Sequence, residues 1–407
     1  MTESQESTTR YAFTRNLLIP QEEMLEVRKK QKKLSIGIPR ELEKYESRVP
    51  LTPEAVEILV NNGHDIIIET DAGKGANYLN TDYSECGGFI VESRKEVFQS
   101  DIVLKVAPLS LDEIGAMKGH QCVLSTLHLN NQTKELIKKL QEKKITAVAF
   151  ENIKDEHNSY PVVRSMSSIA GTTSVLVAAE LLSNVHGGKG VMLGGVTGIT
   201  PTEVVIIGAG TAAEYAVRAA KGLGAFVKVF DHSVHRLRRL QNNIGIPLHT
   251  SIFHPKVLMK ALRSADVVIG AMNLVEKGPR FLVTEDMVKN MKKGTVIVDI
   301  SIDQGGCIET SECKSHNNPV YEKHGVIHYC VPNIPSRVSR TASIALSNVV
   351  GPLILEMGMA GGLQQLIRVD SGFRHGIYIY NGILTNKFIG DHFDIPSKDI
   401  DLLMAAF

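Results

Sequence analysis

The stretch VVIIGAGTAAEYAV, residues 204–217, decides the fold of this chain. Its β-branched run predicts a buried strand, and the glycine-rich turn after it opens a predicted helix. In this pattern Gly208 permits a tight turn, Gly210 lets a phosphate approach the backbone, and Ala213 allows close helix packing. Because the helix N-terminus offers free amides, the motif predicts a site for a dinucleotide pyrophosphate. The alternative is a tight turn that holds no ligand.

The next predicted strand, AFVKVFD, ends at Asp231, about 20 residues after the glycines. An acid at this position can bind the hydroxyl groups of an adenosine ribose and disfavours a 2′-phosphate. Asp231 therefore predicts NAD rather than NADP. Arg236 on the following helix weighs against this choice, together with Arg238 and Arg239. Arginines of this kind form a solvated face more often than a phosphate clamp.

Outward from the motif, predicted strands and helices alternate along most of the chain. Such repeats predict an α/β fold of two Rossmann-like, doubly wound parallel-sheet domains with a cleft between them. We expect an N-terminal extension (1–33), a discontinuous substrate and catalytic domain (34–161 plus 340–407) and an NAD-binding Rossmann domain (162–339). Two long apolar helical segments, one before and one after the second series of strands, are long enough to bridge the domains.

Composition excludes several classes of function. The 407 residues carry 45 Lys and Arg against 44 Asp and Glu, a net charge of +1, which gives no reason to expect a nucleic-acid partner. The five cysteines form no C-x-x-C pair, so reduced thiols of a cytoplasmic protein are expected, with no metal site. No secretory signal and no long uncharged apolar stretch is present, so no membrane insertion is expected.

Four charged residues near predicted strand ends are candidates for chemistry. Asp299 and Asp303 end the strand of GTVIVDISIDQGG, where a buried carboxylate must find a partner. His128 follows the strand of CVLSTLHL at the edge where α/β sheets bind ligands, and can equally be a structural hydrogen-bonding residue. Lys105, in DIVLKVAP, either faces the same edge or extends from the sheet to solvent.

Arg48, in EKYESRVPLTPEAV, precedes a predicted helix with Pro53 at its first position. Its guanidinium group can clamp a carboxylate through two hydrogen bonds. On this stretch alone, a surface ion pair with Glu43 or Glu46 is the favoured alternative.

Together these stretches resemble the alanine dehydrogenase family and its sister group, the α subunit of proton-translocating transhydrogenase. The resemblance covers residues from about 34 to 360, and its matching pieces are IGIPRELEKYESRVPLTPEAV, TLHL, MSSIAGTTS, GGKGVMLGGVTGI, VVIIGAGTAAEYA, VIVDISIDQGGCIE and CVPNIPSRVSRTASIALSNV. The IDQGG and TLHL stretches favour the dehydrogenase branch.

The resemblance implies roles for individual residues. His128 and Asp303 match the catalytic pair of the family, which faces the nicotinamide across the cleft, and Arg48 matches the arginine that binds the substrate carboxylate. Ser167, Asp231 and Asn333 match positions that contact the cofactor. Asp299 is expected to be structural.

The implied activity is the reversible, NAD-dependent oxidative deamination of L-alanine to pyruvate and ammonia, by a cytoplasmic homo-oligomer, either a hexamer or a dimer. Two departures bear on this expectation. Ala107 stands where the dehydrogenases have a substrate-contacting lysine, which leaves Lys105 as a weaker candidate, and Phe253 stands at an adenosine-side serine. The alternatives are a dehydrogenase for another small amino or 2-oxo acid, or a catalytically silent NAD(H)-binding relative of the transhydrogenase subunit.

Overall fold

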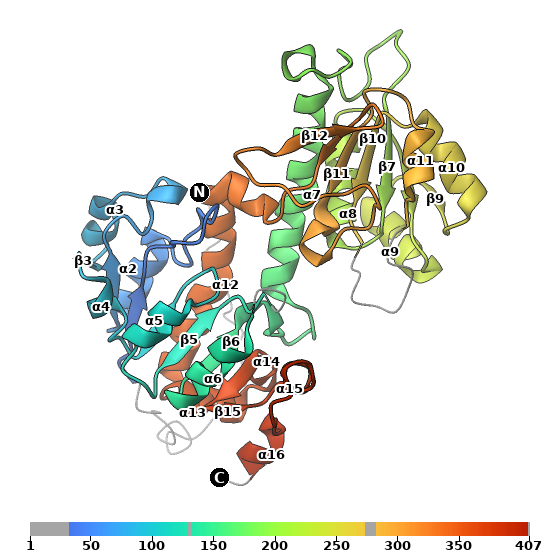
Figure 1. Ribbon diagram of the computed structural model, residues 1–407. Coiled ribbons are helices and arrows are strands. Elements are labelled where there is room, and N and C mark those ends of the chain that lie inside the picture. The colour runs from blue at the N-terminus through green and yellow to red at the C-terminus, as the bar shows by residue number, and fades with distance from the viewer. Residues whose placement is uncertain (1–31, 129–131, 273–281, 406–407) are drawn as a thin grey trace, which may run out of the picture.

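The computed structural model describes residues 32–128, 132–272 and 282–405. These residues form two α/β domains, at the lower left and the upper right of Figure 1. The predicted fold class is confirmed, with the difference that both sheets are mixed. The expected N-terminal extension lies almost entirely outside the described residues, and the exact domain boundaries stay a prediction.

The first domain is built on an eight-stranded sheet in the order β15-β14-β6-β5-β4-β1-β2-β3. Its strands are β1 (Ser35–Ile38), β2 (Asp65–Glu69), β3 (Phe89–Val91), β4 (Ile102–Leu104), β5 (Cys122–Ser125), β6 (Thr146–Ala149), β14 (Ile377–Tyr380) and β15 (Ile383–Leu384). Its helices are α2 (Pro53–Asn61), α3 (Asn80–Glu85), α4 (Arg94–Val97), α5 (Leu111–Ala116), α6 (Lys134–Glu142), α13 (Leu363–Val369), α14 (Ser371–His375), α15 (Lys387–Phe393) and α16 (Ile400–Ala405).

The second domain is built on a seven-stranded sheet in the order β12-β13-β11-β10-β7-β8-β9. Its strands are β7 (Glu203–Ile207), β8 (Phe226–Phe230), β9 (His249–Ser251), β10 (Val267–Gly270), β11 (Val296–Asp299), β12 (Val320–Lys323) and β13 (Val326–Tyr329). Its helices are α8 (Thr211–Gly222), α9 (Val234–Ile244), α10 (Pro255–Ser264) and α11 (Glu285–Lys289). The short 3-10 helices used below are η6 (Ile300–Gln304) and η7 (Ile334–Val338).

The strand order fixes where each domain can hold a ligand. The parallel strands follow the doubly wound pattern twice, β3-β2-β1-β4-β5-β6 in the first sheet and β9-β8-β7-β10-β11-β13 in the second. In such sheets the order reverses once, and ligands bind at the carboxyl ends of the strands that flank the reversal. The flanking strands are β1 and β4 in the first domain and β7 and β10 in the second. Antiparallel pairing involves the edge strands β12 and β15 and the strand β14, which lies between β15 and β6, and these three strands were not expected from the sequence.

Two long helices, α7 (Pro161–Leu182) and α12 (Ser339–Met359), connect the domains (Figure 1). By length and apolar composition alone, α7 and the segment Ile334–Met359 would be able to span a membrane, but half of each apolar window is buried inside the protein. Buried residues of α12, including Leu346, Val350 and Ile354, belong to the core of the first domain. The apolar residues of these helices are therefore accounted for by packing inside the protein.

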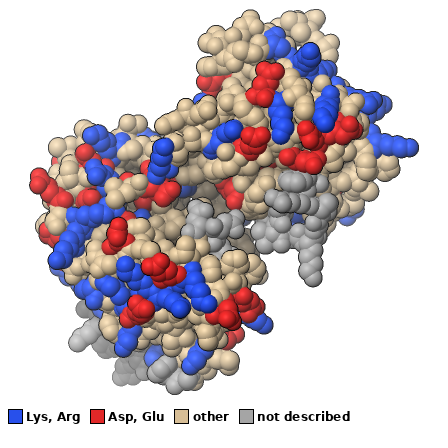
Figure 2. All heavy atoms as spheres, in the orientation of Figure 1, with Lys and Arg blue, Asp and Glu red and all other residues tan. Residues whose placement is uncertain are grey.

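Charged side chains of both signs are interspersed over the face of the molecule drawn in Figure 2. This mixing agrees with the near-zero net charge of the whole sequence, +1. A broad basic surface, which nucleic-acid binding requires, is not seen on this face.

Helix α7 packs on α8 at backbone distance through Gly171. A Cβ atom added at Gly171 would lie 2.1 Å from the carbonyl oxygen of Ala212 and 3.1 Å from the amide nitrogen of Ala216. No real Cβ atom tolerates such a contact, so any larger residue must push the two helices apart. This contact joins the connecting helix to the helix that carries the glycine-rich motif.

We predict that Gly171→Ala destabilises the protein by about 1–3 kcal/mol, because the added methyl group overpacks a backbone contact. Gly222→Ala in α8 is the matched control, since the described structure places nothing within 4 Å of its added Cβ atom. That control should match or slightly exceed wild-type stability, because Ala favours helix over Gly. Thermal unfolding of the three proteins checks the prediction, and an unchanged midpoint for Gly171→Ala would contradict it.

Candidate functional site

The glycine-rich loop between β7 and α8 is shaped to receive a phosphate group. Gly208 has a φ of +115°, and a Cβ atom there would lie 2.3 Å from the carbonyl oxygen of Ala271, after β10. At Gly210 the described residues leave open space around an added Cβ atom. Ala213 is fully buried against the sheet. The open N-terminus of α8 therefore offers amides at the reversal point of the second sheet, which fits a dinucleotide pyrophosphate.

Asp231, which follows β8, holds this loop in place. Its side chain is 1% exposed, and its two oxygens accept hydrogen bonds from the backbone amides of Ala209 (2.8 Å) and Ser233 (2.8 Å). Each carboxylate oxygen has a second lone pair, so these contacts leave acceptor capacity for a ribose hydroxyl. Arg236 lies half-buried in the first turn of α9, and Arg239 donates to the carbonyl oxygen of Ala209 at 3.2 Å. Asp231 and Arg239 thus both form hydrogen bonds with the glycine-rich loop, at Ala209.

Arg48 is buried and paired with Glu46. The Nε and Nη2 atoms of Arg48 donate to the Glu46 carboxylate at 2.8 and 2.6 Å, and the two side chains are 7% and 4% exposed. Of the two partners considered, Glu43 and Glu46, the structure shows Glu46, and the ion pair is interior and not on the surface. Glu46 takes one edge of the guanidinium group and leaves the edge between the two terminal nitrogens without a carboxylate among the described residues. A planar guanidinium can hold a second carboxylate on that edge.

The segment that carries Arg48 is fixed to the end of the second domain and to α12 by serine hydroxyls. Three backbone amides of this segment donate to serine Oγ atoms at 2.9, 2.9 and 3.1 Å, in the pairs Ser47 to Ser336, Val49 to Ser343 and Thr52 to Ser347. Two of these serines are four residues apart, so they share one face of α12. The backbone around Arg48 thus has its orientation set by the helix that joins the two domains.

Asp303 lies in η6, directly after β11. Its Oδ1 accepts a hydrogen bond from the backbone amide of Asn333 at 3.0 Å. Burial raises its pKa to about 6, while the Asn333 amide and the charge of Arg48 act in the opposite direction. Asn333 also donates from Nδ2 to Glu46 Oε2 at 2.9 Å. A continuous path of contacts therefore runs from Arg48 in the first domain to Asp303 in the second.

Asp299 has the structural role that was expected of it. The fully buried carboxylate accepts hydrogen bonds from the amides of Ser301 (3.0 Å) and Cys307 (3.1 Å) and from the hydroxyl of Ser311 (2.7 Å). These contacts close the loop that carries Asp303. The carboxylate at the strand end therefore binds the backbone of its own loop.

His128 follows β5 and has a φ of +40°, a left-handed conformation that is strained for a residue with a side chain. The carboxylate of Glu151 holds the preceding residue, accepting from the Leu127 amide at 2.7 Å. Desolvation and the charge of Arg48 lower the pKa of His128, against a smaller opposite effect of Glu46. The imidazole is therefore neutral at pH 7 and can accept a proton.

Arg48 is an electrostatic neighbour of both predicted catalytic residues. Its positive charge acts on both His128 and Asp303, although these two residues come from different domains. Ser167 is half-buried on α7, next to Met166, whose sulfur lies 3.4 Å from Nη1 of Arg48. His128 and Asp303 therefore both lie within electrostatic reach of Arg48, which also contacts the helix that carries Ser167.

Lys105 has partners inside the first domain. It is 2% exposed, and its Nζ contacts both oxygens of Glu113 at 3.1 Å and the carbonyl oxygen of Pro108 at 3.0 Å. These contacts favour a structural ion pair over a side chain extending to solvent. Contact of Lys105 with substrate stays a prediction.

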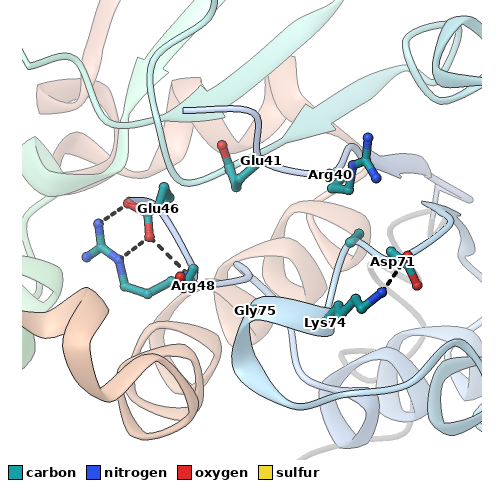
Figure 3. Close-up of a pocket in the computed structure, with 9 residues that line it drawn as sticks. Arg40, Glu41, Glu46, Arg48, Asp71, Lys74 and Gly75 are labelled. Atoms are coloured by element: carbon teal, nitrogen blue, oxygen red, sulfur yellow. Dashed lines mark hydrogen bonds and ion pairs between the residues drawn. The ribbon is translucent and has the colours of Figure 1, made fainter. Parts of the chain in front are cut away.

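A cavity of about 350 Å³ adjoins Arg48 (Figure 3). Figure 3 shows the Arg48–Glu46 pair on one side of it and the Lys74–Asp71 pair on the other. The lining residues are Arg40, Glu41, Glu46, Ser47, Arg48, Asp71, Ala72, Lys74 and Gly75. Sequence reasoning did not single out Glu41 or Glu151, and it placed Glu46 on the surface. The sequence did hold a signal for each of them. Glu46 lies two residues before Arg48, and Glu41 and Glu151 come shortly after predicted strands.

The described residues contain no cluster of three or more His, Cys, Asp or Glu side chains able to hold a metal ion.

Comparison with known proteins gives a consistent result. Residues 37–170 match the family model for the alanine dehydrogenase/PNT N-terminal domain, and residues 174–387 match that for the C-terminal domain. Alanine dehydrogenase 2 of Staphylococcus aureus (strain USA300) is 38% identical over 370 residues, which cover 90% of this chain and 99% of the relative.

Two solved structures show how far the fold is shared. A structure of L-alanine dehydrogenase superposes with a TM-score of 0.83 at 36% identity, covering 89% of this chain and 99% of the other. A transhydrogenase from Sinorhizobium meliloti superposes with a TM-score of 0.73 at 23% identity, covering 86% and 99%, and shares the fold. Family models that together span most of the sequence, with a relative of this similarity, place the protein: the chain belongs to the alanine dehydrogenase/PNT family.

Proposed function

We propose that this chain catalyses the reversible, NAD-dependent oxidative deamination of L-alanine to pyruvate and ammonia. The observation that carries the proposal is the position of Arg48, a buried cation whose charge reaches both His128 and Asp303. The relatives named alanine dehydrogenase support the same activity.

In this proposal Arg48 binds the substrate carboxylate through the edge between its two terminal nitrogens. Glu46 stays ionised, since the guanidinium holds its pKa low against the effect of burial, and it fixes the plane of that group. Charge-assisted pairs of this geometry set both the position and the orientation of a small substrate. The amino group and Cα of alanine are thereby directed toward the region between His128 and Asp303.

His128 and Asp303 handle the protons of the reaction. A neutral imidazole can accept a proton from the substrate amine and return it later in the cycle. Above a pH of about 6 Asp303 is ionised, so it can stabilise positive charge on the substrate nitrogen and orient the water that adds to the imine. When bound, NAD supplies the acceptor for the hydride that leaves Cα.

The proposed cofactor residues are Ser167, Gly208, Gly210, Ala213, Asp231, Arg236 and Asn333. The open amides at Gly210 and the carboxylate of Asp231 fit a pyrophosphate and an unsubstituted ribose. We therefore infer NAD in preference to NADP.

The rival functions are a dehydrogenase for another small amino or 2-oxo acid and a silent NAD(H)-binding protein. Ala107 is the reason to weigh these rivals, because it stands where the family has a lysine that would donate a charged hydrogen bond to the substrate. Losing one charge-assisted hydrogen bond costs about 1.5–3 kcal/mol, which weakens an enzyme without abolishing it. A panel of L-amino acids, assayed for NADH formation, decides between these functions.

We further propose that the protein is a cytoplasmic homo-oligomer without membrane insertion. Several apolar side chains before β7 are exposed in the single chain, namely Val185, Met192, Val196 and Ile199. A second copy of the chain would cover such a surface. Light scattering on the purified protein measures the number of subunits.

For the cofactor, we predict that NADH binds at least about tenfold more tightly than NADPH, a difference of roughly 1.4 kcal/mol. The physical reason is repulsion between the Asp231 carboxylate and a 2′-phosphate. Calorimetric titration with each nucleotide checks this. Equal affinities, or tighter binding of NADPH, would transfer the ribose site to Arg236.

For the proton path, we predict that His128→Ala and Asp303→Asn each lower kcat more than about tenfold, with NADH affinity near that of wild type. A smaller loss would correspond to less than roughly 1.4 kcal/mol of transition-state stabilisation and would exclude a central role. The matched controls are His157→Ala and Asp391→Asn, both exposed and outside the site. Steady-state rates of alanine oxidation at pH 8 to 9 provide the measurement.

A further inference from the structure

Tyr45 lies in a tight turn directly before the pair of Glu46 and Arg48, and its backbone is strained. The amide of Glu46 donates to the carbonyl oxygen of Glu43 at 3.1 Å, which closes a four-residue turn with Tyr45 at its third position. Tyr45 has a φ of +76°. A turn with a positive φ at this position favours Gly or Asn, because a Cβ atom there crowds the backbone. A bulky residue keeps such a conformation only where its surroundings hold it there.

Ser336 holds this turn from outside the loop. Its Oγ donates a hydrogen bond to the carbonyl oxygen of Tyr45 at 2.8 Å and accepts one from the amide of Ser47 at 2.9 Å. A hydroxyl group has one proton and two lone pairs, so it can make both contacts at once. The two peptide groups that it holds are those on either side of Glu46. Ser336 is itself 6% exposed and belongs to η7, which connects the second domain to α12.

The position of Glu46 determines the orientation of Arg48. The Glu46 carboxylate accepts hydrogen bonds from the Nε and Nη2 atoms of Arg48 at 2.8 and 2.6 Å, and its Oε1 also accepts from the Arg48 amide at 3.0 Å. A carboxylate that binds one edge of a guanidinium group fixes the plane of that group. A shift of the Glu46 backbone therefore also shifts the edge of Arg48 that is left for a substrate carboxylate.

We propose that Ser336 is a positioning residue for Arg48, whose hydroxyl group keeps the turn at Tyr45 in the strained form that directs Glu46 to the guanidinium group. This proposal rests on the function proposed above, and Ser336 acts through Glu46 and Arg48 without touching the substrate. The strain is the reason that the hydroxyl group is needed. Without it, Tyr45 relaxes toward a negative φ, and Glu46 moves with its backbone.

A second contact between the same turn and the second domain agrees with this role. The ring of Tyr45 lies with its centroid 6.0 Å from that of His316, in the loop before β12. The Nζ atom of Lys44 lies 5.1 Å from the centroid of the Tyr45 ring. The turn is thus attached to the second domain through the ring of Tyr45 and to η7 through the hydroxyl group of Ser336.

The test compares the kinetics of alanine oxidation by wild type and Ser336→Ala. Without the hydroxyl group, a bound substrate must draw Arg48 back into place, so the loss appears in binding and is recovered at saturation. We expect the KM for L-alanine to rise about tenfold, with a change in kcat of less than about twofold and an NADH affinity near that of wild type. Ser339→Ala is the matched control, because the Ser339 hydroxyl also bonds to the first domain, but at the carbonyl oxygen of Gly75 (2.7 Å), in a different loop. Its KM should equal that of wild type.

Substitutions of Tyr45 test whether strain is the reason for the effect. Tyr45→Gly adopts a positive φ freely, so its turn no longer needs the hydroxyl group. Tyr45→Ala is the matched control, because it also lacks the ring but keeps the Cβ atom and hence the strain. Adding Ser336→Ala should raise the KM about tenfold in the Tyr45→Ala protein and less than about threefold in the Tyr45→Gly protein. Thermal unfolding and NADH affinity verify that each variant is folded.

Equal KM values for Ser336→Ala and wild type would overturn the positioning role. A loss of kcat as large as the rise in KM would do so as well, since bound substrate would then fail to restore the site. Equal rises in KM in the Tyr45→Gly and Tyr45→Ala proteins would contradict the part assigned to strain. Absence of turnover by wild type, with NADH still bound, would instead overturn the proposed function on which this inference rests.

Discussion

The buried pair of Arg48 and Glu46 is the interaction on which the site depends. Removing one member of such a pair leaves an uncompensated interior charge, which costs about 3–5 kcal/mol. In this protein the pair is also connected to the second domain. The Asn333 side chain donates a hydrogen bond to Glu46, and the Asn333 backbone amide donates one to Asp303. The orientation of Arg48 and the placement of Asp303 are thus set by the same few contacts.

Several contacts outside the site hold these residues in their positions. Serine hydroxyls on and before α12 hold the backbone on both sides of Arg48. The close approach of α7 to α8 at Gly171 connects the glycine-rich motif to a helix that also carries Met166 and Ser167. The two domains repeat one strand order, and helices α7 and α12, which connect them, hold one domain against the other.

The sequence was sufficient for the features that depend on local pattern. The glycine-rich turn, the acid at Asp231 and the alternation of strands and helices all follow from periodicity and from the chemistry of turns. Strands β14 and β15 were missed because they are short, with 4 and 2 residues, and such short strands have weak patterns. For Arg48 the sequence left Glu43 and Glu46 open as partners in a surface ion pair; the structure shows Glu46 and buries the pair, because burial of a charged pair is decided by elements far away in the sequence.

Other features needed the three-dimensional structure altogether. The ammonium group of Lys105 lies 3.5 Å from Glu41 but makes its hydrogen bonds to Glu113 and Pro108, and sequence spacing alone does not predict that choice of partners. The individual roles of His128 and Asp303 came from resemblance to a family, because either residue alone is compatible with a structural role. The structure adds their shared electrostatic neighbour, Arg48.

The first sheet has a consequence for how the protein emerges from the ribosome. Strands β14 and β15, which complete the edge beyond β6, come more than 200 residues later in the chain than β6, after the whole second domain. Helix α12, which supplies core residues of the first domain, is also made after the second sheet. The first domain to be started is therefore the last to be finished. While it waits, the open edge of β6 and the uncovered core face are surfaces that chaperones must protect during synthesis.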